Sequence, residues 1–500
     1  MAKTYSCILV GVDVHIIEIE SVMGSGFSGL NILGLPTDAT RDMRERVRSA
    51  LESIGIPIPA RRVVVNVSSN ELIKLSRTYL AQLDFAIAAC IIRALFEDND
   101  DKSILYQPEQ EFLAGELSLS AELKPIANPL IYEAISSHQN SKSTTICLSH
   151  NEDYVYPQFE YYKNLKEWFE ARKSFKNKSK NEIPPHIEDE KNKRELKITK
   201  EKFDLAKQTA ELLLKTPKAF IALLVAAAGK HNVLLAGEPG IGKSFSIKRL
   251  PSLLLPLKEK EKIEVKLIHS SADIAEKPFR YPHHTTTAAA LVGGSSLKPG
   301  EVTLAHHGVL FLDELAEFPR SSLEALREPL DSGYVTLSRA NGNILYPAQF
   351  QLCATTNPCP CGYRYSRKKA CRCNPTESAK YLQKISGPLL DRFCLQVWIP
   401  SEEEENKSDI FCQQLKKIVA QNKLELFLAH FFKVQEQIST APVDLERTKI
   451  ECNFSLRGKE KIEKIAYTFE KLFPHLCGDK KFQEDVLSYR RLTALFSQGH

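Results

Sequence analysis

An eight-residue segment near the middle of the chain constrains the fold most. Residues 237–244 read GEPGIGKS and fit the pattern G-x-x-x-x-G-K-[ST]. They follow an apolar stretch, residues 232–236, which is typical of a buried strand, and they lead into a segment with a helical pattern. A strand, a glycine-rich turn and a helix in this order predict a phosphate-binding loop on a parallel α/β sheet. A glycine-rich turn without a ligand is the alternative.

Each residue type in this segment suits a nucleotide. Glycines let backbone N–H groups turn toward phosphate oxygens, Lys243 neutralises the β- and γ-phosphates, and the Ser244 hydroxyl ligates Mg²⁺. The expected cofactors are therefore ATP and Mg²⁺. The expected nucleotide ligands are Gly237, Glu238, Pro239, Gly240, Ile241, Gly242, Lys243, Ser244 and Asp313.

A second strand-like segment supplies the acidic groups that hydrolysis needs. Residues 309–312 are apolar and end at Asp313 and Glu314, about 70 residues after Lys243. Asp313 would hold Mg²⁺ together with Ser244, and Glu314 would activate the attacking water. On its own such a segment occurs by chance, but beside the phosphate loop it predicts hydrolysis rather than binding alone.

Three downstream residues are candidates for sensing or stabilising the γ-phosphate. An apolar strand over residues 350–355 places Asn357 at its end, and Arg392 follows a turn at residues 387–391. An exposed arginine there would reach the site of a neighbouring subunit; a surface salt bridge is the alternative. Arg457 would contact the phosphates from a helical lid, or it is simply an arginine at a helix start.

Length and composition predict about three domains. The 500 residues are 43% apolar and 26% charged, and they include neither an export signal nor an apolar run of about 18 residues. A cytoplasmic protein without a membrane partner is expected. The predicted domains are an α/β domain over residues 1–165, a charged linker over 166–202, an ATPase core over 203–400 and a helical lid over 401–500.

Local patterns support this division. In the first domain Ile8, Val10, Val12, Val14 and Ile16 alternate as in a strand, and residues 61–67 give another. The linker prediction rests on residues 171–202, which are rich in charge and poor in large apolar side chains. Residues 219–228 predict a buried helix.

Four of the twelve cysteines are clustered. Cys359, Cys361, Cys371 and Cys373 form C-x-C-x₉-C-x-C within residues 357–375, and four thiolates can close tetrahedrally on Zn²⁺. The sequence predicts a structural zinc site, with two reduced thiol pairs as the alternative.

This cysteine loop is strongly basic. Between residues 364 and 384 seven basic residues oppose one acid, a local charge of +6 against +5 for the whole chain. With Tyr363 and Tyr365, such a loop would grip phosphates and stack bases; solvated surface is the alternative. Asn341 and Gly342 favour a tight hairpin turn, which places Arg339 near the tip of the hairpin, where it would contact a threaded strand. The expected DNA contacts are Arg339, Arg364, Arg367, Lys368 and Lys369.

Together these motifs strongly resemble the magnesium-chelatase-like ComM (YifB) family of AAA+ ATPases. Further matching segments are residues 278–280, 282–284, 291–294, 299–301, 305–308, 357–362 and 386–392, with looser matches at 34–36, 58–59 and 115–118. The resemblance implies a doubly wound AAA+ ATPase domain, a helical lid and a hexameric ring. It further implies a DNA helicase that promotes branch migration when naturally transforming bacteria integrate incoming DNA.

The resemblance also implies that the N-terminal domain has the fold of Lon-type proteases, which use a Ser/Lys dyad. Residues 79–85 contain no serine where the nucleophile is expected, so the chain is not expected to be a peptidase. The phosphate loop departs from the family at Glu238 and Ile241, where proline and threonine are usual, and Thr356 replaces a methionine. Glu238 would weaken affinity for ATP if its carboxylate pointed inward.

Other functions share these motifs. A chelatase-type or protein-remodelling AAA+ ATPase would use the same motor on a different substrate. A nucleotide-dependent switch without mechanical output would hydrolyse ATP slowly and without stimulation.

Overall fold

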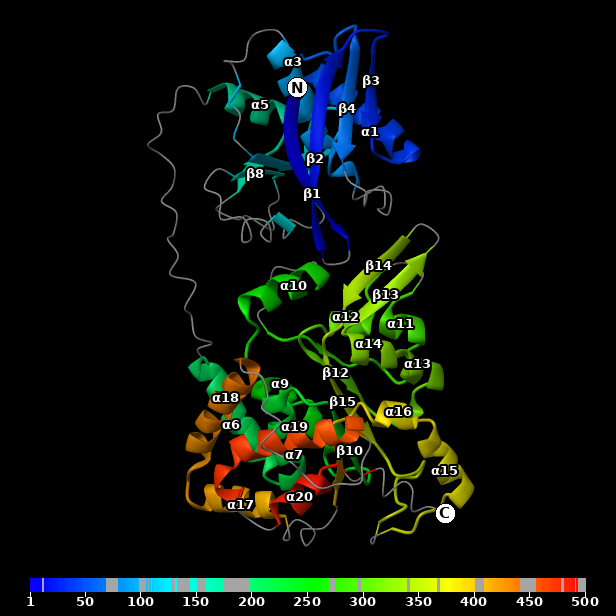
Figure 1. The fold of residues 1–500 in the computed structure, drawn as a ribbon, viewed down its shortest axis with the longest axis vertical. Coiled ribbons are helices and arrows are strands. Elements are labelled where there is room, and N and C mark those ends of the chain that lie inside the picture. Colours follow the sequence, from blue (N-terminus) through cyan, green and yellow to red (C-terminus); the bar gives the residue numbers. More distant parts are fainter. Residues whose placement is uncertain are drawn as a thin grey trace. The chain divides into compact units, whose positions relative to one another are not determined.

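The chain folds into two compact units, one built mainly from Met1–Lys193 and the other from the chain that follows (Figure 1). The computed structural model describes residues 1–10, 13–68, 80–98, 105–106, 108, 110–126, 131–132, 144–150, 159–174, 198–269, 276–294, 298–339, 342–366, 369–400, 409–440, 456–477, 481–490 and 492.

A seven-stranded mixed sheet forms the N-terminal unit, in the order β3-β4-β2-β1-β5-β8-β9. Neighbours β1, β2 and β4 pair antiparallel, and the other neighbouring pairs are parallel. A separate two-stranded sheet joins β6 and β7. The strands are β1 (Ala2–Val10), β2 (Asp13–Gly24), β3 (Gly29–Leu33), β4 (Arg62–Ser68), β5 (Gln110–Ala114), β6 (Glu116–Leu117), β7 (Leu123–Lys124), β8 (Thr144–Ser149) and β9 (Glu160–Tyr162).

Three helices accompany this sheet: α1 (Thr37–Ser53), α3 (Asp84–Asp98) and α5 (Leu165–Ser174). Helix α3 is almost entirely apolar and packs against β1, β2 and β5. At its first residue the buried Asp84 carboxylate accepts hydrogen bonds from Arg46 and from the Leu117 backbone N–H. The Lon-like character of this unit stays a prediction.

Two expectations for this unit were wrong. The alternating run from Ile8 to Ile16 belongs to two antiparallel strands, β1 and β2, because β1 ends at Val10 and β2 starts at Asp13. Residues 166–174, expected in the linker, belong to α5, where Trp168 and Arg172 are fully buried. The next part of the predicted linker, residues 175–197, lies outside the described residues.

The second unit contains a five-stranded parallel sheet in the order β11-β12-β15-β10-β16. Strand β10 (VLLAG), between β15 and β16, is buried throughout, as a parallel sheet covered on both faces requires. The strands are β10 (Val233–Gly237), β11 (Phe279–Arg280), β12 (Val309–Leu312), β15 (Gln351–Thr356) and β16 (Leu395–Ile399). A hairpin, β13 (Tyr334–Arg339) with β14 (Gly342–Pro347), precedes β15.

Helices fill the rest of the chain after the N-terminal unit. They are α6 (Lys200–Leu213), α7 (Pro217–Gly229), α8 (Lys243–Ile247), α9 (Leu250–Leu253), α10 (Glu259–His269), α11 (Ala288–Val292), α12 (Glu301–Leu304), α13 (Arg320–Ala325), α14 (Arg327–Ser332), α15 (Pro375–Gln383), α16 (Gly387–Leu390), α17 (Ile410–Ala420), α18 (Leu424–Thr440), α19 (Leu456–Leu472) and α20 (Phe482–Ser488), with 3₁₀ turns at Leu315–Glu317 and Pro474–Leu476.

Alternate side chains of each strand enter different cores. Val233 and Leu235 of β10 join a cluster with α7, α17, α18 and α19, whereas Leu234 and Ala236 join the cluster on the other face. Helix α7 is buried nearly all round because its sequence, PKAFIALLVAAAG, has no polar face. The C-terminal helices therefore pack on α7 rather than forming a core of their own. None of the helices in the described part of the chain has the length and apolar composition that crossing a membrane requires.

Candidate nucleotide-binding site and cysteine cluster

The phosphate loop connects the end of β10 to the start of α8. Gly242 is the residue before α8 and has φ +94°, a left-handed conformation that favours glycine. The first backbone N–H groups of α8 are therefore available to an anion at the carboxyl edge of the sheet.

Lys243 lies at the centre of the site and is only 7% exposed. Its Nζ donates hydrogen bonds to the carbonyls of Gly237 and Glu238, both at 2.7 Å, and to Asn357 Oδ1 at 3.1 Å. Burial lowers the pKa of Lys243 to about 8, although Asp313, Glu314 and Glu238 favour its charged form. The structure thus brings Asn357, the predicted γ-phosphate sensor, into direct contact with the loop lysine.

The pKa of Lys243 predicts that the affinity of the protein for ATP depends on pH. The Lys243 ammonium is charged below pH 8 and loses its proton as the pH rises through about 8, whereas bound phosphates would keep it charged. We expect the affinity for ATP to be constant between pH 6.5 and 7.5, and to fall by up to roughly tenfold per pH unit above 8. Titrations with a fluorescent ATP analogue across this range measure it. A Lys243→Arg variant, whose charge does not titrate, should lose the pH dependence; a fall that persists there contradicts the assignment.

The magnesium residues predicted from the sequence also meet. Ser244 Oγ donates to Asp313 Oδ1 at 2.6 Å, so a hydroxyl and a carboxylate lie side by side between α8 and the end of β12. Oxygen donors of this kind are the ligands that Mg²⁺ prefers, and a metal beside the phosphates normally retains water and phosphate oxygens as its other ligands. Ser244 and Asp313 therefore fit the metal.

Glu314 directly follows Asp313 in the chain, and its environment differs from that of Asp313. It is exposed and adopts a left-handed conformation, with φ +54°, as the chain turns out of β12. Its backbone N–H donates to Thr355 Oγ1 at 3.1 Å, which fixes the turn while leaving the carboxylate toward solvent. An exposed carboxylate one residue after the metal ligand suits a group that activates water.

Two residues of this site were not predicted. Thr355 Oγ1 donates to Asp313 Oδ1, and the Tyr281 hydroxyl donates to Asp313 Oδ2 at 3.0 Å. Tyr281 stacks on Phe311 with ring centroids 4.9 Å apart, and Lys248 Nζ lies 4.6 Å from its ring centre. Only the strand order could have indicated them, because Tyr281 follows β11 and Thr355 lies one residue before the end of β15, and these two strands flank β12.

The remaining candidate arginines are placed differently. Arg392 was expected to be exposed, but its side chain is only 10% exposed, and it donates to Asp331 and to the Pro388 carbonyl. The expectation failed because Asp331, 61 residues away in sequence, folds beside it. Arg457 is the second residue of α19 and Arg339 the last of β13, and both side chains lie outside the described residues, as do Arg367 and Lys368.

The four cysteines of the predicted metal site converge. Cys359 Sγ lies 3.4 Å from Cys361 Sγ and 3.7 Å from Cys371 Sγ, and Cys373 Sγ accepts the Cys361 backbone N–H at 3.3 Å. A tetrahedral zinc with Zn–S bonds of about 2.3 Å places its sulfurs about 3.8 Å apart. Backbone N–H groups of Tyr363 and Arg372 lower the pKa of the Cys361 thiol to about 6, which favours the thiolate that a metal needs. The residues therefore fit Zn²⁺.

Metal analysis tests this site. Protein purified under reducing conditions should carry about one zinc per chain, and Cys371→Ser should lower the zinc content several-fold because three thiolates bind zinc less tightly than four. Cys477→Ser, a change at an exposed cysteine in a different part of the unit, is the control. Full zinc content in the Cys371→Ser variant would rule out the four-cysteine site.

A second group of potential ligands does not suit a metal. Glu264, His306 and His307 lie close enough to share an ion. However, His306 Nδ1 accepts the Gln349 N–H at 3.1 Å, so its Nε2 must carry the proton and donate to Glu264. A protonated nitrogen cannot ligate, and this group is a hydrogen-bonded cluster.

The cysteine loop contacts the phosphate loop directly. A Cβ on Gly362 would lie 2.3 Å from Pro239 Cγ, so only glycine allows the two loops to approach this closely. Ser366 Oγ donates to Glu238 Oε2 at 3.0 Å. Glu238, which would weaken ATP binding if it pointed inward, instead directs its carboxylate to the cysteine loop.

Comparisons with known proteins agree with this geometry. Residues 213–407 match the family model described as magnesium chelatase, subunit ChlI, and residues 19–151 match a second model, subunit ChlI of Mg-chelatase. The chain is 31% identical to the competence protein ComM of Haemophilus influenzae, over all of this chain and 99% of that protein. It is 31% identical to Escherichia coli YifB, an uncharacterised protein, over 97% of this chain and 96% of the relative.

The chain belongs to the magnesium-chelatase-like ComM/YifB family. An uncharacterised Mycobacterium tuberculosis protein is 33% identical over 79% of this chain and 76% of its own length. Membership of the ComM/YifB family makes the chain an AAA+ ATPase, with ATP and Mg²⁺ as its cofactors. The first family match contains the phosphate loop, Asp313 and Glu314, and the cysteine cluster.

Proposed function

We propose that this protein is a ring-shaped, ATP-driven DNA motor of the cytoplasm that promotes branch migration when incoming DNA is integrated during natural transformation. Its subunits form a hexamer in which each ATP lies between Lys243 of one subunit and Arg392 of the next. The name of the Haemophilus influenzae relative, a competence protein, supports this role.

The observation that carries the proposal is the contact between the phosphate loop and the basic cysteine loop. Pro239 and Glu238 touch Gly362 and Ser366, so a change in the phosphate loop on hydrolysis reaches the cysteine loop at once. That loop offers positive charge and aromatic rings: Lys369 Nζ lies 4.4 Å from the Tyr363 ring centre, and Tyr365 is exposed.

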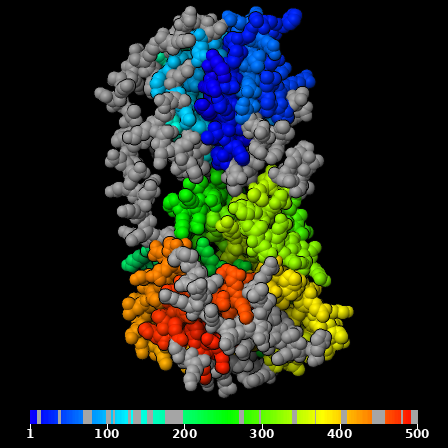
Figure 2. Space-filling view, viewed as in Figure 1, coloured from blue at the N-terminus to red at the C-terminus, as the bar shows by residue number. Residues whose placement is uncertain are grey.

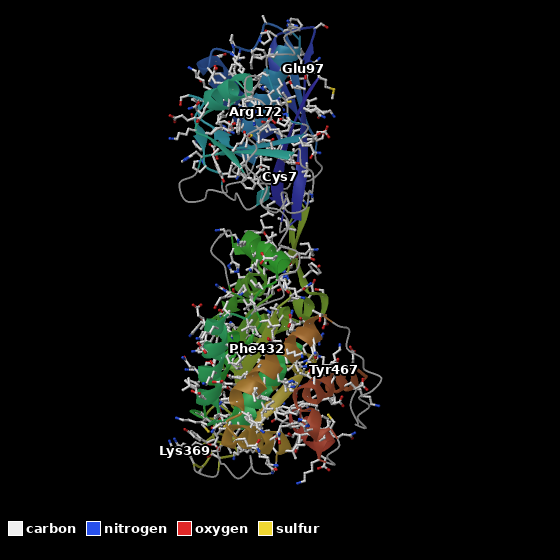
Figure 3. The ribbon with its side chains drawn as sticks, turned by 90° about the vertical axis from the view of Figure 1, so that its left-hand side faces the viewer. Cys7, Glu97, Arg172, Lys369, Phe432 and Tyr467 are labelled. Atoms are coloured by element: carbon white, nitrogen blue, oxygen red, sulfur yellow. The ribbon has the colours of Figure 1, made fainter. Side chains whose placement is uncertain are left out.

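The surface around the loop is open to a ligand. Lys369 lies at the periphery of its unit in Figure 3, whereas Phe432 lies among the core helices. Helix α15, which follows the cysteine loop, is part of the yellow surface in Figure 2, and its Lys380 is exposed. Exposed cations next to aromatic rings suit single-stranded or branched DNA.

DNA stimulation of ATP hydrolysis tests the proposal. The ATPase rate should rise several-fold with forked DNA, and the protein should migrate a synthetic four-way junction in the presence of ATP. Arg364→Ala combined with Lys369→Ala should reduce the stimulation and leave the basal rate unchanged. An ATPase rate that forked DNA does not alter, together with a static junction, would exclude a DNA motor.

A chelatase-type or protein-remodelling ATPase is the second candidate, because the family model that matches residues 213–407 is named for magnesium chelatase. This candidate predicts an ATPase whose rate changes with a polypeptide or a metal-inserting partner and does not change with DNA. The same assays, with an unfolded polypeptide in place of forked DNA, separate the two candidates.

A further inference from the structure

A cavity of about 420 Å³ lies at the opposite edge of the parallel sheet from the phosphate loop. Its walls are the end of α7, the segment after α9, the residues that begin β12 and β15, and α18. Amino and carboxyl ends of parallel strands lie at opposite edges of a sheet, so this cavity is separate from the ATP site. Its volume falls in the range of small-molecule sites.

The cavity has an excess of positive charge. Lys230, Lys258 and Lys277 line it, against the single carboxylate of Glu261. Glu261 lies 3.9 Å from Lys230 and also accepts the Lys258 backbone N–H. Within the part of the chain that the structure describes, no carboxylate forms a salt bridge with Lys277. Burial, reinforced by the charges of neighbouring lysines, lowers the pKa of Lys277 to about 8. Among the described residues the Glu261 carboxylate favours the charged form of Lys277 without forming a salt bridge with it, and a bound anion would stabilise this ammonium further.

The cavity wall on α18 contains a buried glutamine. Gln435 of α18 is 4% exposed, and its Nε2 donates to the Ala227 carbonyl at 2.7 Å, which fixes the orientation of the amide. Its Oε1 is buried and has no partner among the described residues. This oxygen is covered by protein atoms, so Gln435 contributes a fixed surface to the cavity rather than an acceptor for a ligand.

From these observations we infer that this cavity binds a small phosphate ester, at a site distinct from the ATP site. The phosphate meets the ammonium groups of Lys277 and Lys258, and the rest of the ester lies against Gln435 and Ile438 of α18. A diffusible ester suits a space of this size better than a nucleic-acid strand does. Because Gln435 belongs to α18 and the lysines do not, the ligand bridges the C-terminal helices and the sheet edge.

Calorimetry with ribose 5-phosphate as the probe tests this inference. The full chain is first saturated with ADP and Mg²⁺, so that the phosphate loop is occupied. We expect one saturable site per chain, and Lys277→Gln and Lys258→Gln should each weaken binding roughly tenfold. Lys262→Gln is the matched control, since Lys262 lies on α10 but pairs with Glu259 and does not line the cavity. Thermal unfolding of each variant shows that it is folded.

Three results would overturn the inference: no saturable binding by the ADP-loaded wild type, equal binding by both cavity variants and the control, or lysine-dependent binding of a single-stranded oligonucleotide without binding of ribose 5-phosphate. ATP hydrolysis and DNA stimulation are measured separately, so failure here leaves the proposed motor function untouched.

Discussion

Glu314→Gln is expected to bind ATP and Mg²⁺ with wild-type affinity and to hydrolyse ATP at least about 100-fold more slowly. The change keeps the shape of the side chain and removes only the carboxylate. Lys243, Ser244 and Asp313, which would hold the phosphates and the metal, make hydrogen bonds that do not involve the Glu314 side chain. Binding and hydrolysis should therefore separate in this variant.

Single-turnover hydrolysis and binding of a fluorescent ATP analogue measure the two effects. Lys243→Ala should lose binding as well as turnover, because it removes the only ammonium that the phosphate loop contributes. Glu328→Gln, at an exposed position of α14, is the matched control and should behave as wild type. Hydrolysis at the wild-type rate by the Glu314→Gln variant would show that a group other than Glu314 activates the attacking water.

The sequence predicted which residues the fold brings together around the phosphate loop, because the parts of this site are local. A strand, a glycine-rich turn and a helix follow one another over about 15 residues, and the apolar run before Asp313 ends where its strand ends. Parallel strands carry their carboxyl ends to one edge, which brings Lys243, Asp313 and Asn357 together. The cysteine cluster was predictable for the same reason, since its four residues span only 15 positions.

The wrong predictions concern positions where contacts between residues far apart in the sequence determine the structure. The alternation from Ile8 to Ile16 crosses a change of strand and does not mark one buried face: Ile8 is buried and pairs with His15, whereas Ile16 pairs with Cys7 and is 45% exposed. Residues 166–174 look like linker by their charge, yet Arg172 is buried because Glu111, 61 residues earlier in the chain, accepts its hydrogen bond at 2.7 Å. Tyr281 and Asp331 were missed because no local pattern links them to Asp313 and Arg392.

In the assembled ring, Arg392→Ala is expected to retain ATP binding and to lose turnover by about 1,000-fold. Within its own chain the Arg392 guanidinium is held by Asp331, which is exposed, and by the Pro388 carbonyl. We propose that it exchanges Asp331 for the γ-phosphate of the neighbouring subunit. Arg327→Ala, which breaks an exposed pair with Glu324 on the adjoining helix, is the matched control and should keep its turnover.

Mixed rings distinguish a shared site from a purely structural arginine. Arg392→Ala subunits keep Glu314, and Glu314→Gln subunits keep Arg392, so each variant supplies what the other lacks. Where a Glu314→Gln subunit offers its arginine to an Arg392→Ala neighbour, that interface contains a complete site, and the mixture should regain turnover that neither variant has alone. An arginine that acts only through Asp331 within its own chain cannot be complemented, and the mixture would then remain inactive at every ratio of the two subunits.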